Sequence, residues 1–583
     1  PVPSATRQVF DVALWILVMG CLGAAIWVLL FPLLKGLPDA GTGLAATTGW
    51  MLPAWLMWLG SELRIWDISA ATATWIFLAL VGAAAARGWC RRREIVEVFF
   101  RRRNTLFKVV VVTTAVGLLF LVIRAFNPAI FWGEKPMDFA FLNAFLRTPV
   151  WPPGEPWMAG MPLNYYYFGE VLAAFPILVV GCSSGVGYNL ISATIPALSA
   201  AVLASFGLVL ARRRRWFAVT LLPLLVLLTG NLAWPWLSGL AKEGKFFDLW
   251  WATSRVIPGF ALDEYPLWTA LFADLHGHFI ALPVFLATLF WGWITVRLRD
   301  RCWLFAAAVC GTGAAVVVAT NPWDLFLLTA TLAAGVVAAA RRPFAGFGRL
   351  ASAGVFSLVA SAPFIVELVA GINAGAGGRG VFLTGADFAP AWAVLRHFGL
   401  FLVPLGVLAI ALLGRRWWLM LPTAGLGILG GLSFESTAAA LGLAAAAVFA
   451  TVMIFSRARL DRFGWALATL GSLAIATAER FTLIDRMNTL FKIYNGAWVI
   501  FAVALGTMLL RTRGGRRRLL LAVWLPLQIV AAVNLPLGIA QGWLQPRITS
   551  PRPSLNGQAF LASRDPQTLF LVRALQGLSL IHI

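Results

Sequence analysis

The sequence predicts an all-α, polytopic integral membrane protein, and three observations support this prediction. Hydrophobic residues make up 60% of the chain and charged residues only 12%, whereas about a quarter of a soluble domain is charged. The hydrophobic residues form long runs of about 20 residues, the length that crosses a bilayer as a helix. Lysine and arginine gather between these runs, as they do in cytoplasmic loops.

The lengths of the runs predict about sixteen transmembrane helices. The expected spans are residues 12–34, 44–66, 69–87, 107–126, 186–211, 216–237, 276–298, 302–320, 324–340, 350–370, 394–413, 416–432, 436–456, 463–479, 496–510 and 519–540. Arg91–Arg103 is predicted to be an amphipathic helix on the inner surface, in contact with anionic lipid headgroups. Phe168–Gly181 is apolar but too short to cross, so we expect a helix at the outer interface.

Seven basic clusters orient the chain. They contain 28 of the 46 Lys and Arg residues, and the positive-inside rule places all of them on the cytoplasmic side. The clusters are Arg87–Lys108, Arg212–Arg215, Arg297–Arg301, Arg341–Arg349, Arg415–Arg416, Arg457–Arg462 and Arg511–Arg518. With this topology the polar motifs all fall outside. We therefore expect a multi-pass protein of the plasma (cytoplasmic) membrane whose working face is extracytoplasmic.

Charge and cysteine usage exclude two classes of function. The net charge of +22 comes from short basic clusters between apolar runs, so it reflects membrane topology and no nucleic-acid partner is expected. None of the five cysteines forms a CxxC pair, which argues against a disulfide framework and a thiolate metal site. Because the chain starts at Pro1 and stops soon after an apolar tail, we expect a fragment of a longer reading frame.

Two acids open the loop that follows the span at 107–126. Glu134 and Asp138 lie four residues apart, and Pro136 could open a helix between them. The two carboxylates would then share one helical face. Such a pair can act as general base and partner, or bind a cation. The alternative is a solvated loop in which the acids are helix caps.

The motif FADLHGH contains Asp274, His276 and His278 at the outer end of a predicted span. The chain has only four histidines, and two of them are in this motif. Carboxylate and imidazole groups together suit Zn²⁺ or Mn²⁺, or proton transfer. Only Asp274 and His278 would share a helical face, so a site with three ligands requires non-helical backbone. The alternative is a polar cap at the membrane interface.

Two further outer segments contain polar candidates. In NPWD, Pro322 breaks an apolar run, and Asn321 and Asp324 either cap the two half-helices or line a site. In the loop before FADLHGH, Arg255 could hold a phosphate by a bidentate contact, and Glu264 is a second candidate. A plain solvated charge is an equally good interpretation of Arg255.

The segment Glu479–Trp498 places cations outside, against the positive-inside bias. Arg486 and Lys492 lie in it, together with Asn488. Cations on the outer side of a span are natural anchors for a lipid phosphate or diphosphate. The alternative is a belt of bases that extend along the membrane interface.

Six strings in order along the chain point to one family. They are EKPMDFAFLNA, PPGEPWMAGMPLNYYYFGE, SRVIPG followed by EYP, DLHGHFIALP, NPWD and RMNTLFKIYNGAW. Together they resemble the archaeal and Chloroflexus-type YYY membrane protein family, a domain-of-unknown-function family named for a tyrosine triplet. That triplet is Tyr165–Tyr167 in this chain, and the resemblance extends from about Trp15 to Ala562.

The layout is also similar to that of the GT-C glycosyltransferases, including the aminoarabinose and protein mannosyl transferases. Their first outer loop opens with an acidic pair, continues through a Pro- and Tyr-rich segment, and ends in an interfacial helix. The likeness implies a GT-C-like core over residues 106–540. A three-helix membrane extension with the basic surface helix would precede it at 1–105, and a truncated extracytoplasmic region would begin at 541–583.

This resemblance implies a glycosyltransferase that moves a hexosyl or pentosyl group from a polyprenyl-phosphate donor to an acceptor outside the membrane. The catalytic base would be Glu134 or Asp138. A divalent metal (Mg, Mn or Zn) would bind Asp274, His276 and His278. The substrate-binding residues would be Tyr165, Tyr166, Tyr167, Arg255, Glu264, Asn321, Asp324, Arg486, Asn488 and Lys492. The alternative is a transporter or flippase of lipid-linked saccharides, although the sequence has no internal repeat and its polar motifs lie at one face.

Overall fold

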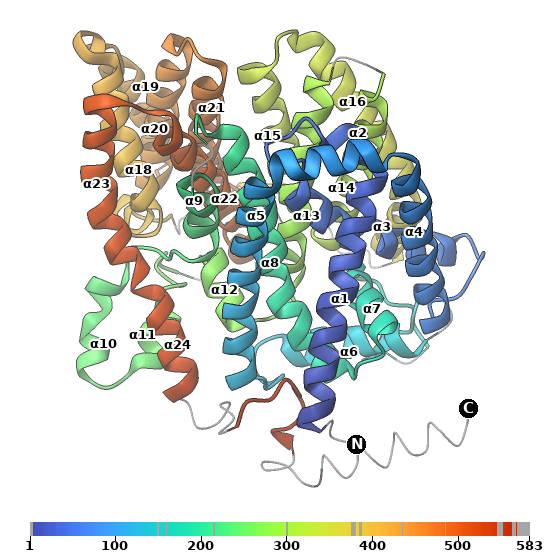
Figure 1. The fold of residues 1–583 in the computed structure, drawn as a ribbon. Helices are drawn as coiled ribbons and strands as arrows, with labels where there is room; N and C mark the ends of the chain where they lie inside the picture. Colours follow the sequence, from blue (N-terminus) through green and yellow to red (C-terminus); the bar gives the residue numbers. More distant parts are fainter. Residues whose placement is uncertain are drawn as a thin grey trace.

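The computed structural model describes residues 4–148, 151–158, 160–213, 216–259, 261–298, 301–374, 381–383, 388–433, 435–483, 485–544, 552–561 and 567. These residues form a bundle of α-helices with one small two-stranded ribbon (Figure 1). The predicted all-α fold class is therefore confirmed. The ribbon pairs β1 (Val381–Leu383) antiparallel with β2 (Phe481–Leu483), and so connects two loops that are distant in sequence.

The helices lie along the chain in the following order, divided here at Asp274. The first part contains α1 (Ala5–Leu29), α2 (Phe31–Leu34), α3 (Thr42–Glu62), α4 (Ala70–Cys90), α5 (Arg92–Phe126), α6 (Lys135–Arg147), α7 (Phe168–Val180), α8 (Ser184–Leu210), α9 (Trp216–Leu227), η1 (Trp234–Leu237), α10 (Ser238–Lys242), α11 (Phe246–Ala252) and α12 (Pro266–Phe272). The second part contains α13 (Gly277–Arg297), α14 (Trp303–Thr320), α15 (Asp324–Ala339), α16 (Pro343–Ala360), α17 (Ala362–Ala374), α18 (Ala391–Leu413), η2 (Gly414–Leu419), α19 (Met420–Leu432), α20 (Thr437–Phe455), α21 (Arg459–Arg480), α22 (Arg486–Arg511), α23 (Gly514–Ala532) and α24 (Asn534–Leu544).

The number of spanning helices differs from the prediction. Among the described residues, eleven helices are long and apolar enough to cross a membrane, and α7, α9 and α15 are shorter apolar helices. Each predicted span coincides at least in part with a helix, but the count of sixteen spans is not confirmed. One reason is that the run predicted as one span at 216–237 contains α9 and then the separate turn η1. A second reason is that the runs predicted as two spans at 394–413 and 416–432 count as one apolar helical segment, Ala391–Leu432.

The predicted surface helix Arg91–Arg103 is part of a longer element. It forms the first part of α5, a single helix of 35 residues. This part lies across one end of the bundle before the helix bends and runs along the bundle axis (Figure 1). Lys35 at the end of α2 holds it through an ion pair of 2.6 Å with Glu94. The predicted domain boundary between residues 105 and 106 therefore falls inside a continuous helix.

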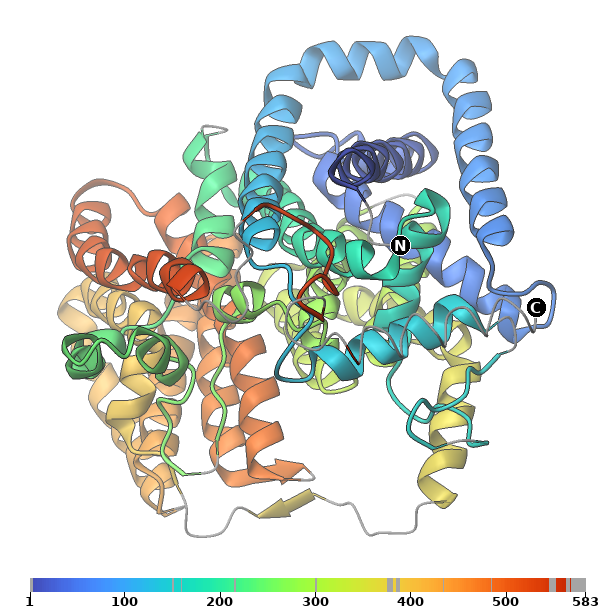
Figure 2. The same ribbon diagram turned by 90° about the horizontal axis from the view of Figure 1, so that it is seen from below.

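The helices of the first outer loop lie at the opposite end of the bundle. Figure 1 shows α6 and α7 in the lower part of the bundle, with α11 and α12 at a similar height, while the first part of α5 crosses the upper part. The view from below shows α6, α7 and the loops around them at this end (Figure 2). The basic segment at 91–103 and the acidic loop are thus at opposite ends, as the predicted topology requires.

The helices of the predicted extension pack on those of the predicted core. Trp50 in α3 donates a hydrogen bond of 2.8 Å to the carbonyl of Leu172. Trp291 in α13 donates one of 3.0 Å to the hydroxyl of Thr48. Of the predicted region 541–583, residues 545–551, 562–566 and 568–583 lie outside the described residues. The division into an extension, a core and a C-terminal region stays a prediction.

Candidate functional site

A tight turn brings Glu134 to the start of α6. Trp132 and Gly133 both have left-handed backbone angles, with φ of 76° and 62°. The backbone N–H of Glu134 then donates a hydrogen bond of 3.1 Å to Oδ2 of Asp274, which comes from the FADLHGH motif. The helix begins at Lys135 with Pro136 in its first turn, as predicted. Two motifs that are far apart in sequence therefore meet at this turn.

His276 holds the side chain of Glu134. Its Nδ1 lies 2.6 Å from Oε2 of Glu134, and its Nε2 lies 3.3 Å from the hydroxyl of Tyr166. Burial and the nearby Lys492 ammonium lower the pKa of His276, so the ring is neutral at neutral pH. A neutral ring with its proton on Nδ1 donates a hydrogen bond to the carboxylate of Glu134 and accepts one from the hydroxyl of Tyr166. This hydrogen bond lowers the pKa of Glu134, which is therefore ionised.

Asp138 has a different environment from that of Glu134. The side chain of Glu134 is 56% exposed, whereas Asp138 is only 2% exposed. Burial, followed by the neighbouring carboxylate of Asp274, raises the pKa of Asp138 well above its usual range. Two carboxylates in contact cannot both ionise easily, so Asp138 is protonated at neutral pH. Of the two acids predicted as the base, only Glu134 is both accessible and ionised.

A buried cation lies beside this group. Lys492 in α22 is 2% exposed, and its Nζ lies 3.3 Å from Nδ1 of His278. The ammonium interacts electrostatically with the carboxylates of Glu134, Glu264 and Asp324. The sequence predicted Lys492 in a loop before the span at 496–510, but the helix begins at Arg486. These interactions connect segments from four different parts of the chain.

The three predicted metal ligands do not form a ligand set. Asp274 accepts from the backbone of Glu134, His276 contacts Glu134 and Tyr166, and His278 contacts the Lys492 ammonium. No group of three or more His, Cys, Asp or Glu within the described residues could hold a metal ion. These three side chains therefore act as hydrogen-bonding groups in the site.

NPWD and the tyrosine triplet are only partly in the site. Asn321 and Asp324 flank the break between α14 and α15, and both polar atoms of the Asn321 side chain are buried without a hydrogen-bond partner. Tyr165 stacks on Tyr166 with 4.0 Å between ring centroids. Tyr167 has a different partner, because its hydroxyl donates a hydrogen bond of 2.6 Å to the carboxylate of Glu367. The prediction that all three tyrosines line one site is therefore not supported.

Arg255 and Glu264 belong to a loop that packs against the same region. The guanidinium of Arg255 lies 3.7 Å from the ring centre of Trp251. Glu264 is buried, accepts a hydrogen bond of 3.2 Å from Thr269, and interacts electrostatically with Arg255 and Lys492. Burial raises the pKa of Glu264 to about 8, so this group is mostly protonated at neutral pH. Glu264 is therefore near the buried ammonium, whereas Arg255 is connected with it only through Glu264.

Arg486 and Asn488 lie at the start of α22 and have structural partners. Asp485 caps this helix. The backbone N–H and the side-chain amide of Asn488 each donate a hydrogen bond of 2.7 Å to the carboxylate of Asp485. Arg486 lies 3.5 Å from the carboxylate of Glu479 and donates to the carbonyl of Pro258 at 3.4 Å. No described contact connects either residue with Glu134 or His276. Their predicted role in substrate binding therefore has less support than that of Lys492.

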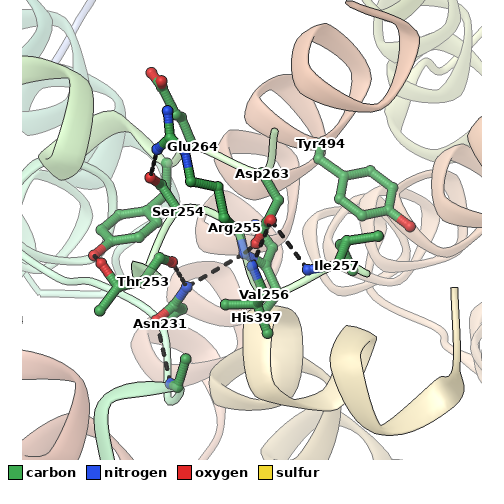
Figure 3. A network of polar contacts seen from close by, with 12 residues as sticks. Asn231, Thr253, Ser254, Arg255, Val256, Ile257, Asp263, Glu264, His397 and Tyr494 are labelled. Atoms are coloured by element: carbon green, nitrogen blue, oxygen red, sulfur yellow. Dashed lines mark hydrogen bonds and ion pairs between the residues drawn. The ribbon is translucent and has the colours of Figure 1, made fainter. Parts of the chain in front are cut away.

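A buried histidine–aspartate pair, which no sequence motif indicated, lies behind the loop. His397 Nδ1 in α18 lies 3.0 Å from Oδ2 of Asp263, and both side chains are 0% exposed. Asp263 also accepts hydrogen bonds from the backbone N–H groups of Val256 and Ile257, at 2.8 and 3.2 Å (Figure 3). The pair thereby fixes the loop that contains Arg255. A lone histidine in an apolar run was the only signal that could have identified it.

We expect His397→Ala to destabilise the protein strongly. It would leave Oδ2 of Asp263 buried without its partner, and breaking a buried pair in this way costs about 3 to 5 kcal/mol. Thermal unfolding of the protein in detergent measures this as a lower melting temperature. His397→Asn is the matched control, because it keeps a hydrogen-bond donor and should lose less. Equal melting temperatures for wild type and His397→Ala would contradict this role.

The chain matches the model of one protein family over most of its length. A family model described as uncharacterized membrane protein (DUF2298) matches residues 52–501, a range that includes Glu134, His276 and Lys492. The chain belongs to this family. The resemblance inferred from the ordered motifs is thereby confirmed, as is the multi-pass membrane character of the protein. No curated protein matches the sequence.

One solved structure is distantly similar to this member of the DUF2298 family. It is the archaeal oligosaccharyltransferase AglB from Archaeoglobus fulgidus, in complex with an inhibitory peptide and a dolichol-phosphate. The two chains are 12% identical with a TM-score of 0.32. The match covers 76% of this chain and 56% of the other, so it spans little more than half of that structure. A likeness this distant does not define a common fold or site.

Proposed function

We propose that this protein is a membrane glycosyltransferase of GT-C type. It would move a sugar from a polyprenyl-phosphate donor to an acceptor hydroxyl at the extracytoplasmic face. The observation that carries the proposal is the pairing of an accessible, ionised Glu134 with a neutral His276 at 2.6 Å, close to the buried Lys492 ammonium. A base beside a cation is the arrangement that transfer from a phosphate-linked donor requires.

In the proposed reaction Glu134 takes the proton of the acceptor hydroxyl. The acceptor oxygen bonds to the anomeric carbon of the sugar as the bond between that carbon and the phosphate oxygen breaks. The polyprenyl phosphate leaves with the bonding electrons, and its added negative charge is stabilised by Lys492 and by Arg255. His276 keeps the carboxylate oriented through its Nδ1 proton. Tyr165 and Tyr166 offer a stacked aromatic surface to the sugar or the lipid.

The pH dependence of transfer tests the role of His276. Because hydrogen bonding to His276 lowers the pKa of Glu134, the base is ionised down to an unusually low pH. His276→Phe removes the donor, so the pKa of Glu134 rises and the acid limb of kcat/KM moves to higher pH. At neutral pH we expect a loss of roughly tenfold, the equivalent of one charged hydrogen bond. His276→Asn keeps a donor at this position and should retain an acid limb near that of the wild type.

Transfer of a labelled sugar in proteoliposomes tests the proposal as a whole. Purified protein is supplied with polyprenyl-phosphate-linked sugars, and the label is followed into an acceptor outside the vesicle. We expect wild type to turn over and the double variant Glu134→Ala plus Asp138→Ala to be inactive. Turnover that survives in the double variant would end the assignment of a carboxylate base. Movement of the lipid-linked sugar across the bilayer without transfer would favour a transporter.

A further inference from the structure

A long apolar groove lies between the helices on the side of the bundle away from Glu134. Its cavity volume is about 70 Å³, and side chains of α8, α13, α15, α21 and α22 line it. Phe206, Phe290 and Phe463 contribute aromatic surface, and Gly335 leaves the wall of α15 open. Apolar grooves of this kind on a membrane protein can accept a hydrocarbon chain.

The groove leads into a cavity lined by arginines. This second cavity is open to solvent and has a volume of about 780 Å³. The two cavities share Val296, Arg297, Ala339 and Ala340 in their walls, so they are adjacent. The arginines that line the second cavity come from the ends of four helices and the loops beside them: Arg297, Arg341, Arg342, Arg349, Arg459 and Arg511. None of its described lining residues is acidic.

Little in the described structure neutralises these arginines. Arg511 pairs with Asp461, and Arg349 donates to backbone carbonyls at the end of α13. Arg297 is near the like charges of Arg341 and Arg459. Among the described residues, no carboxylate lies within ion-pair distance of any of the three. Guanidinium groups brought together in this way favour a phosphate, which several of them can contact at once.

We propose that this is a binding site for an anionic phospholipid. Part of one hydrocarbon chain would lie against the apolar groove, and the phosphate would lie among the arginines. Basic pockets between transmembrane helices on the cytoplasmic side have the chemistry that holds such headgroups. The site is separate from the proposed catalytic site, because His276 precedes the start of α13 and Arg297 ends this helix of 21 residues. At about 1.5 Å per residue, the two ends are roughly 30 Å apart.

Lipid retention by the purified full chain tests this site. Protein in detergent is mixed with phosphatidylglycerol, cardiolipin or phosphatidylcholine, and bound lipids are counted by native mass spectrometry. We expect wild type to retain at least one anionic phospholipid under conditions that remove phosphatidylcholine. The double variant Arg341→Gln plus Arg459→Gln should bind at least tenfold more weakly. These side chains are exposed, so the melting temperature should not change.

Matched controls separate this site from general attraction to basic surfaces. Arg415→Gln plus Arg416→Gln removes two exposed cations from η2, outside the cavity, and should leave retention unchanged. Gly335→Leu should block the groove, since a Cβ there meets only Phe463 at 3.6 Å and the longer side chain extends into the groove. Gly354→Leu, in α16 with no atom within 4 Å of its Cβ, is its control.

Three results would overturn the proposal. The first is equal retention of phosphatidylcholine and the anionic lipids by the wild-type protein. The second is an equal loss of binding in the control variants. The third is retention of polyprenyl phosphate in preference to phospholipid at this cavity, which would assign it to a different lipid. Failure of this proposal leaves the proposed sugar transfer unaffected, because the two sites are at opposite ends of α13.

Discussion

Glu134→Gln should lower kcat for sugar transfer by about 10²- to 10⁴-fold, the usual contribution of a general base. The substitution keeps the size of the side chain and removes only its ability to accept the proton. Glu134 is the accessible acid of the pair and is ionised, since His276 hydrogen-bonds to it at 2.6 Å. The measurement is the initial rate of label transfer in proteoliposomes with saturating donor.

Two further variants make this result specific. Asp138→Asn should reduce the rate less, because Asp138 is buried and already protonated. Glu155→Gln changes an acid in the loop that follows α6 and should leave the rate unchanged. A rate above one tenth of the wild type in Glu134→Gln, together with an inactive Asp138→Asn, would exchange the roles of the two acids.

Lys492→Met should lower kcat by about 10²-fold, the cost of removing one group that stabilises charge in the transition state. The ammonium is 2% exposed, so its field acts in a medium that screens charge weakly. The leaving phosphate gains negative charge as the sugar is transferred, which means that kcat should fall more than KM rises. Separate determination of kcat and KM for the lipid-linked donor measures this difference.

Folding must be controlled in this experiment, because Lys492 also compensates nearby carboxylates. Lys492→Arg keeps the charge and should recover part of the activity. Lys242→Met removes a lysine at the end of α10 and should be silent. A rise in KM with unchanged kcat would show that Lys492 contributes only to donor binding.

The general architecture of the membrane bundle could be predicted because hydrophobic runs and basic clusters are local signals. The meeting of Glu134 with His276 could not, since these residues are far apart in sequence and only the tertiary packing brings them into contact. The acidic pair and the FADLHGH motif nevertheless identified Glu134 and His276 as candidates. The difference between Glu134 and Asp138 also depends on burial, which spacing alone does not contain.

Other features of the site depend on local structure and packing that the sequence pattern does not contain. The sequence placed Lys492 in a polar loop, but Asp485 caps a helix that starts earlier than the apolar run. The three tyrosines were treated as one group, yet the hydroxyl of Tyr167 donates to Glu367. His397 and Asp263 belonged to no recognisable motif, so the pair became visible only once α18 was packed against the loop.

The most direct test of the central claim is a structure of the protein, determined by electron cryo-microscopy, with a polyprenyl phosphate bound. We predict density for the phosphate within hydrogen-bond distance of the Lys492 ammonium, on the same side of the bundle as the Glu134 carboxylate. Density for the phosphate only in the arginine-lined cavity, with none near Lys492 or Glu134, would contradict the proposed site of sugar transfer.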